Sequence, residues 1–281
     1  MSASYFISVY GAFLSPIIIG FCLAKFTSLN SANVLPLIRN ILFPIVIFDG
    51  LRNSFIISNA IYVIGIGAVC VVLVHFISLL GGKFIPPLAG LNSFPNVALF
   101  TIPFFAVALN KQGFSTVCQF FLGSALGHLG LNAKRMSWQN AIKEPWAVAA
   151  IVAIIVSLTR MNISFVNNVI QPMRGAIYPI ILIYLGCCFN PIPRFDKEAF
   201  ISIGTRMASG FVIAFLAIRF LPINHLSKAV MLAAISPPGS FGTLDRSNGA
   251  DYSEKIGILV GIVVFISIIY FNLRPWNLRL F

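Results

Sequence analysis

The chain has 281 residues, of which 58% are hydrophobic and only 9% are charged, and its mean hydropathy is +0.94. A soluble globule of this length needs far more charged surface, so these values exclude a water-soluble enzyme and predict a membrane protein. The net charge of +12 comes from 19 Lys and Arg against 7 Asp and Glu. Because the basic residues stand singly at the ends of apolar runs, we interpret them as anchors at the membrane surface and not as a nucleic-acid interface. Arg39, Arg174 and Arg206 are likewise expected near helix ends, from which their side chains can reach the membrane surface.

Charges, prolines and glycine clusters divide the sequence into ten apolar spans. A helix that crosses a bilayer needs about 20 residues, so ten spans leave no room for a separate soluble domain. The first span has no basic segment before it and many spans after it, so we expect an uncleaved helix and not a signal peptide. The spans are 5–25, 34–51, 56–82, 85–109, 114–132, 145–160, 164–189, 199–218, 225–248 and 255–274.

The longest polar connection, 133–144, combines Lys, Arg and Trp, which is typical of a segment lying along a membrane surface. Lys and Arg are more frequent on the side of this connection than on the side of the two termini. The positive-inside rule therefore places the connection in the cytoplasm and both termini outside. The sequence predicts a multi-pass protein of the cell (plasma) membrane.

An internal repeat appears at an offset of 135 residues. The segment from Arg39 to Ile45 and the segment from Arg174 to Ile180 share the pattern Arg-x-x-aliphatic-aromatic-Pro-Ile. The same offset places Thr101-Ile102-Pro103 on Ser236-Pro237-Pro238. An offset of 134 places the glycine pair Gly123/Gly127 on Gly257/Gly261; this GxxxG spacing favours close packing of helices inside the protein over a dimer contact, although a homodimer stays open.

Each copy of the repeat contains five spans, and five is odd, so the second copy must cross the membrane in the opposite direction. The predicted fold is therefore an all-α integral membrane protein with ten transmembrane helices in two inverted five-helix repeats. We place the repeats at 1–132 and 145–281, joined by the interfacial cytoplasmic connection 133–144. Many secondary transporters are built in this way, with the substrate site at the repeat interface near the bilayer midplane.

The fourth and ninth spans are both interrupted by proline, which removes a backbone donor and clashes with the preceding turn. We expect two broken helices that cross near the midplane, whose exposed N-termini favour an anion. Simple proline kinks in packed helices are the alternative. The candidate substrate-binding residues are Asn92, Pro95, Asn96, Thr101, Pro103, Ser236, Pro237, Pro238 and Ser240, with Asn96 the strongest because a buried amide is costly unless it is used.

Three titratable residues inside spans are candidates for ion or proton coupling: Asp49, His75 and His128. Asp49 also stands three residues before Arg52, and an ion pair at the helix end is the more favoured interpretation. A lone histidine inside a span more often forms a hydrogen bond to a neighbouring helix than a coupling site. The five cysteines lack metal-ligand spacing, so we expect no disulfide framework, no metal and no cofactor.

These motifs resemble the auxin efflux carrier family of permeases, within the larger group that includes bile-acid symporters. The resemblance rests on Asn96 followed seven residues later by Pro103, on Pro179 followed by Leu185-Gly186, on Gly249-Ala250-Asp251 after Pro237-Pro238, and on Lys143-Glu144-Pro145. It covers essentially the whole chain. It implies ten helices, crossing broken helices, and export or uptake of small organic anions.

The sequence and the resemblance together predict a secondary transporter of a small organic anion, such as a carboxylate, that works by alternating access. A sodium-coupled symporter of the bile-acid type is the nearer alternative, and proton or sodium coupling stays open. An intramembrane enzyme is a remote alternative, because neither an H-E-x-x-H nor a G-x-S-x-G motif occurs. The expected partners are the substrate anion and the lipid bilayer.

Overall fold

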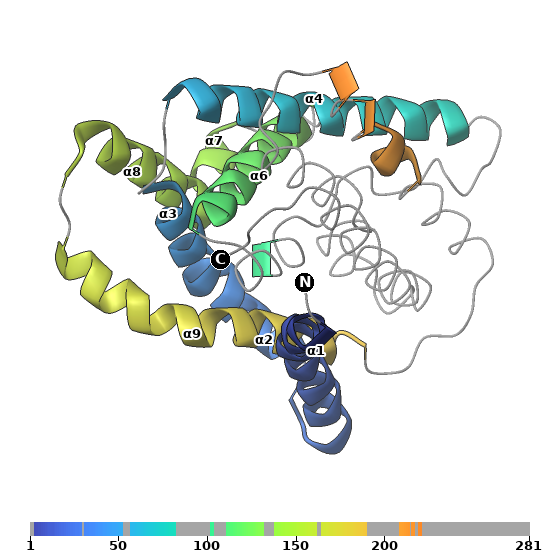
Figure 1. The fold of residues 1–281 in the computed structure, drawn as a ribbon, viewed down its shortest axis with the longest axis vertical. Helices are drawn as coiled ribbons and strands as arrows, with labels where there is room; N and C mark the ends of the chain where they lie inside the picture. The colour runs from blue at the N-terminus through green and yellow to red at the C-terminus, as the bar shows by residue number, and fades with distance from the viewer. Residues whose placement is uncertain are drawn as a thin grey trace. The chain divides into compact units, whose positions relative to one another are not determined.

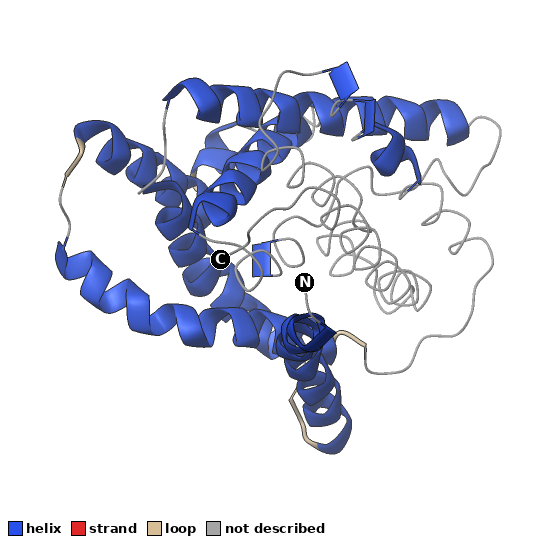
Figure 2. Cartoon of the chain, viewed as in Figure 1, coloured by secondary structure: helices blue, strands red, loops and turns tan. Residues whose placement is uncertain are grey.

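The computed structural model describes residues 3–29, 31–52, 57–82, 102–103, 111–131, 138–161 and 164–189, with short helical stretches at 208–213, 215–216 and 219–220. These parts of the chain are helical and contain no strand (Figures 1 and 2). The helices are α1 (Ala3–Phe26), α2 (Ser31–Leu37), the π-helix η1 (Ile38–Leu42), α3 (Phe43–Arg52), α4 (Ile57–Gly82), α6 (Lys111–Leu131), α7 (Trp138–Ile142), α8 (Pro145–Thr159) and α9 (Ser164–Cys187).

Six of the predicted spans are found as helices, each beginning and ending within about one turn of its predicted bounds. They correspond to α1, the run from α2 to α3, α4, α6, α8 and α9. The predicted spans 225–248 and 255–274, nearly all of 85–109 and more than half of 199–218 lie outside the described residues. The all-α part of the predicted fold class is confirmed for the part of the chain that the structure describes, and the ten-helix count stays a prediction.

The second span is one run of helix, Ser31–Arg52, in which the five residues of η1 adopt π geometry. The Phe43 backbone N–H donates to the Ile38 carbonyl, five residues back. Pro44 follows directly, and its ring would clash with the carbonyl of Asn40 in a regular α-helix. A local π turn relieves such a clash, so Pro44 accounts for the position of η1.

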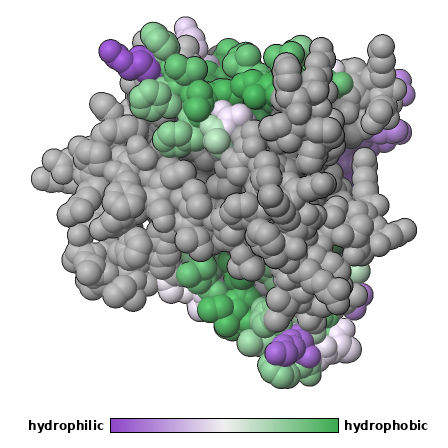
Figure 3. Space-filling view, turned by 90° about the vertical axis from the view of Figure 1, so that its right-hand side faces the viewer, coloured by the Kyte–Doolittle hydropathy of each residue, from purple (hydrophilic) through white to green (hydrophobic). Residues whose placement is uncertain are grey.

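Four helices in the described residues are long and apolar enough to cross a membrane: Ser31–Arg52, Ala60–Ile77, Gly113–Leu131 and Asn168–Cys187. Large apolar side chains of α4 are exposed along the helix rather than buried, among them Val69, Leu73, Phe76 and Leu80. Apolar side chains also lie on the surface of the described parts in Figure 3. Exposed apolar surface of this kind is unfavourable in water and is suited to lipid, which indicates a membrane protein.

The chain divides into two compact units, which are interleaved along the sequence. The first contains residues 1–62, 102–119 and 132–191, and the second contains residues 63–101, 120–131 and 192–281. Each unit thus takes segments from both predicted repeats. This division concerns packing, and leaves the predicted boundary between repeats at 133–144 untested.

In the first unit α1 packs along α9, and α3 packs along α8. Glycine allows the α1–α9 contact to be close: a Cβ at Gly20 would meet the backbone of Ile183, and a Cβ at Gly186 would meet the backbone of Ile17. On α8 the buried residues are the small Ala150 and Ala153. Small residues at both helix contacts let the backbones approach, as in membrane helix pairs generally.

In the second unit the contact between α4 and α6 depends on the glycine pair that the sequence singled out. A Cβ at Gly123 would meet the backbone of Ile64, and a Cβ at Gly127 would meet the backbone of Ala68. Gly67 of α4 likewise leaves no room for a side chain against Phe120. The prediction that Gly123 and Gly127 serve internal packing is confirmed.

Candidate functional site

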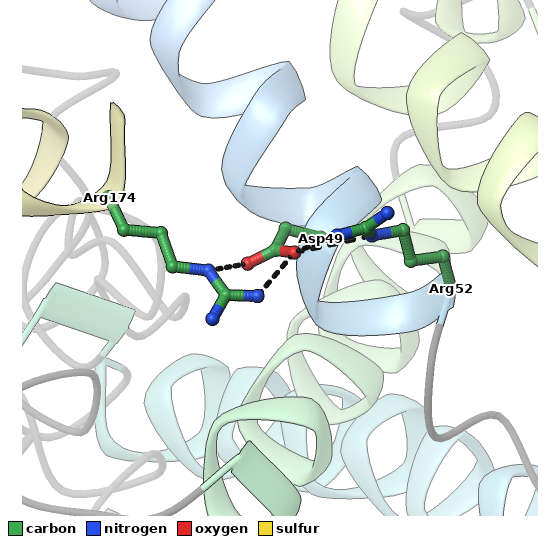
Figure 4. A network of polar contacts seen from close by, with 3 residues as sticks. All are labelled: Asp49, Arg52 and Arg174. Carbon is green, nitrogen blue, oxygen red and sulfur yellow. Dashed lines mark hydrogen bonds and ion pairs between the residues drawn. The ribbon is translucent and has the colours of Figure 1, made fainter. Parts of the chain in front are cut away.

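Three charged side chains of the first unit form one network between α3 and α9 (Figure 4). The Arg174 guanidinium donates from Nε to Asp49 Oδ2 at 2.5 Å and from Nη2 to Asp49 Oδ1 at 2.6 Å. Arg52 donates from Nη2 to the same Oδ1 at 3.0 Å and from Nε at 3.3 Å. Asp49 is therefore shared by two arginines, one from its own helix and one from α9.

This network is buried to different degrees at its two ends. The side chains of Asp49 and Arg52 are 2% and 3% exposed, whereas that of Arg174 is 30% exposed. Arg52 also lies against the Phe48 ring, 5.5 Å from its centroid. Removing such charges from water is costly, and the several charge-assisted hydrogen bonds to Asp49 offset that cost.

The predicted pair between Asp49 and Arg52 is confirmed, but its setting differs from the expectation. The pair is buried, and Asp49 also binds Arg174, which the sequence did not predict. Arg174 was expected near a helix end, from which its side chain could reach the membrane surface; it is instead the eleventh residue of the 24-residue α9. An arginine in the interior of an apolar helix needs a buried acceptor, and Asp49 supplies it.

Aromatic and small side chains surround the network. Gly50, next to Asp49, lies against Cys118 and Phe114 of α6, where a Cβ would not fit. The Phe114 ring packs edge to face on Tyr178 of α9, with ring centroids 6.0 Å apart. Near Phe114, the buried Ser115 hydroxyl is the one fully buried side-chain N or O atom in the described residues that has no hydrogen-bond partner.

A second arginine–carboxylate pair joins η1 to the start of α8. Arg39 donates from Nη2 to Glu144 Oε1 at 2.7 Å and from Nε to Oε2 at 3.4 Å. Arg39, also expected near a helix end, is the ninth residue of the 22-residue run Ser31–Arg52. The π segment, the extended backbone of Glu144 and Pro145 at the first turn of α8 bring the two side chains together. The pair is more exposed, at 59% and 26% of the two side chains.

Most of the predicted substrate-binding residues lie outside the described residues. These are Asn92, Pro95, Asn96, Thr101, Ser236, Pro237, Pro238 and Ser240. Pro103 is described, and it is helical and buried next to Ile102. The predicted breaks and crossing of the fourth and ninth spans therefore stay predictions.

The two histidine candidates belong to the second unit. His75 lies in α4, where its ring contacts Phe76 edge on, and His128 lies in α6. The five cysteines are free thiols, as expected. The described residues contain no group of three His, Cys, Asp or Glu that could hold a metal ion.

No protein-family model matches the chain, and no curated protein matches it. The Asp49 network has no nucleophile paired with a base, but it presents two guanidinium groups in an apolar setting. Such an arrangement can hold two helices together and can attract an anion.

Proposed function

We propose that the protein is a secondary membrane transporter, resembling auxin efflux carriers, that moves a small organic anion by alternating access. One observation carries the proposal: the first unit has two main helix contacts, and the predicted repeat maps each of them onto the other. In the predicted repeat, α1 corresponds to α8. The run of helix that begins with α2 and ends with α3 corresponds to α9. The contact of α1 with α9 is then the counterpart of the contact of α8 with α3.

This exchange is what a two-fold relation between inverted repeats requires, so it supports the five-plus-five arrangement. The repeat-related arginines add to it, since Arg39 and Arg174 both lie inside helices and both bind a carboxylate through Nε and Nη2. A soluble or purely structural helical bundle has no need of repeated intramembrane charges. Inverted repeats with buried charged residues are typical of secondary transporters.

The test is transport by the purified full-length protein in liposomes. We expect radiolabelled small carboxylates, tested as a panel, to accumulate in response to a proton gradient. Accumulation that instead follows a sodium gradient would favour the bile-acid type of symporter. If liposomes with and without the protein took up every carboxylate of the panel equally under both gradients, the result would contradict a carboxylate transporter.

Asn96→Ala is expected to weaken binding of the best transported carboxylate by about 1–3 kcal/mol, the usual result of leaving a polar partner unsatisfied. Asn96→Asp should weaken it more, because a second negative charge would compete for the same helix N-termini. Asn40→Ala removes an exposed amide of η1 and is the matched control. Calorimetric affinity and thermal stability are measured together; unchanged affinity in Asn96→Ala would place the substrate elsewhere.

The proposed topology has its own test. Single cysteines at residues 2 and 280, in a background without the native cysteines, should react with an impermeant maleimide added to intact cells. A cysteine at residue 134 should react only after the membrane is permeabilised. Labelling of residues 2 and 280 from opposite sides would exclude an even number of spans, and with it the inverted five-helix repeats.

A further inference from the structure

Arg174 has hydrogen-bond donors that its ion pair does not use. It meets Asp49 through Nε and Nη2 only, and its Nη1 group makes no hydrogen bond to the described residues. In Figure 4 that nitrogen points away from Asp49. The Arg174 side chain is 30% exposed, so part of it is open to solvent or to a ligand. Donors directed at lipid would be costly, so the edge is suited to water or to a negatively charged ligand.

Tyr178 places a second unused donor on the same face of α9. It follows Arg174 by four residues, which puts the two side chains one turn apart on one side of the helix. Its hydroxyl makes no hydrogen bond to the described residues. The contact with Phe114 limits how the ring can turn.

We propose that Arg174 and Tyr178 form a binding site for a small carboxylate ligand. The free edge of a guanidinium offers parallel N–H groups, which match the two oxygens of a carboxylate, and the phenol supplies one further donor. Asp49 occupies the adjacent Nε–Nη2 edge of Arg174 and holds the guanidinium in place. Its repulsion of a ligand is reduced because it also binds Arg52.

The position of Arg174 favours a free ligand over a lipid headgroup. With a rise of about 1.5 Å per residue, Arg174 lies roughly 9 Å from the start of the apolar run Asn168–Cys187 and roughly 20 Å from its end. Phosphate groups lie outside the apolar core of the bilayer, which is about 30 Å thick, so a headgroup would have to leave the membrane surface to reach this arginine. Binding tests this site and transport tests the proposed function, so one can fail without the other. A transporter whose carboxylate binding is unaffected by substitution of Arg174 and Tyr178 would keep the proposed function and remove this inference.

Binding of acetate and of succinate to the purified protein tests the site. Calorimetric titrations in a maltoside detergent and a chloride buffer, at constant ionic strength, compare the wild type with variants. Tyr178→Phe keeps the ring and its packing, so folding should be retained, and we expect five- to tenfold weaker binding of the carboxylate that binds. Arg174→Gln should weaken binding of this carboxylate at least tenfold.

Matched controls remove the same groups elsewhere. Tyr62→Phe deletes a highly exposed phenol, and Arg39→Gln deletes the repeat-related arginine; both should bind within about twofold of the wild type. Equal affinity of Tyr178→Phe and the wild type would overturn the site, as would failure of both anions to bind the wild type. If phosphatidylglycerol displaced the bound carboxylate and Tyr178→Phe kept the wild-type affinity, the anion binding would be assigned to a lipid contact instead.

Discussion

Asp49→Ala is expected to lower the free energy of unfolding by about 3–5 kcal/mol, the range measured when one partner of a buried ion pair is removed. The carboxylate accepts hydrogen bonds from Arg52, which is 3% exposed, and from Arg174 across the α3–α9 contact. Its loss leaves both guanidiniums without this acceptor in an apolar setting. Unfolding of the purified protein in mixed detergent micelles, followed by circular dichroism, measures the effect.

Glu144→Ala is the matched control, since it removes the carboxylate of the other arginine pair. Arg39 and Glu144 are 59% and 26% exposed, so solvent screens them, and their loss should cost only about 0–1 kcal/mol. Equal destabilisation by the two substitutions would show that burial of the Asp49 network adds nothing to stability. That outcome would also argue against the ion pair that joins Arg174 of α9 to Asp49 of α3.

Local features of the structure were predictable because their causes are local. Apolar runs with prolines and charges between them located six helices, including α8 with Pro145 at its start. The Asp49–Arg52 pair was predictable from its spacing within one helix. The GxxxG spacing of Gly123 and Gly127 likewise indicated a helix contact, although it did not identify α4 as the partner helix.

Contacts between distant segments were not predictable in the same way. Arg174 and Asp49 are separated by 125 residues, and no pattern within either helix names the partner. A signal was present, however: an arginine inside an apolar span must find a carboxylate, and the chain has only 7 Asp and Glu. Placing Arg174 at a helix end removed that constraint, because an arginine there can reach water.

Repeat-related positions also differ in ways that the sequence pattern does not reveal. Pro44 and Pro179 occupy the same place in the repeated motif, yet η1 is a π segment while α9 keeps α geometry around Pro179. Arg39 and Arg174 bind carboxylates from different elements, the start of α8 and the interior of α3. A repeat therefore predicts which helices correspond, while the local geometry depends on neighbours that each copy meets separately.

Gly186→Ala is expected to destabilise the protein by about 1–3 kcal/mol, the usual range for overpacking. A Cβ at residue 186 would meet the carbonyl group of Ile17 and lie 2.8 Å from the backbone nitrogen of Phe21. These atoms belong to the backbone of α1 and cannot turn aside as a flexible side chain would. The substitution should therefore push α1 away from α9, and the loss should appear as a lower midpoint of thermal unfolding in detergent.

Gly175→Ala, in the same helix, separates this effect from a change in helix propensity. Apart from its own stretch of helix, no atom lies within 4 Å of a Cβ at residue 175. The added methyl group should therefore leave stability unchanged or raise it by up to about 1 kcal/mol, because alanine favours helix over glycine. The two substitutions make the same chemical change eleven residues apart in α9. If Gly186→Ala were as stable as Gly175→Ala, the close contact of α1 with α9 would not contribute to the fold, and the paired helix contacts that support the inverted repeat would lose one of their two members.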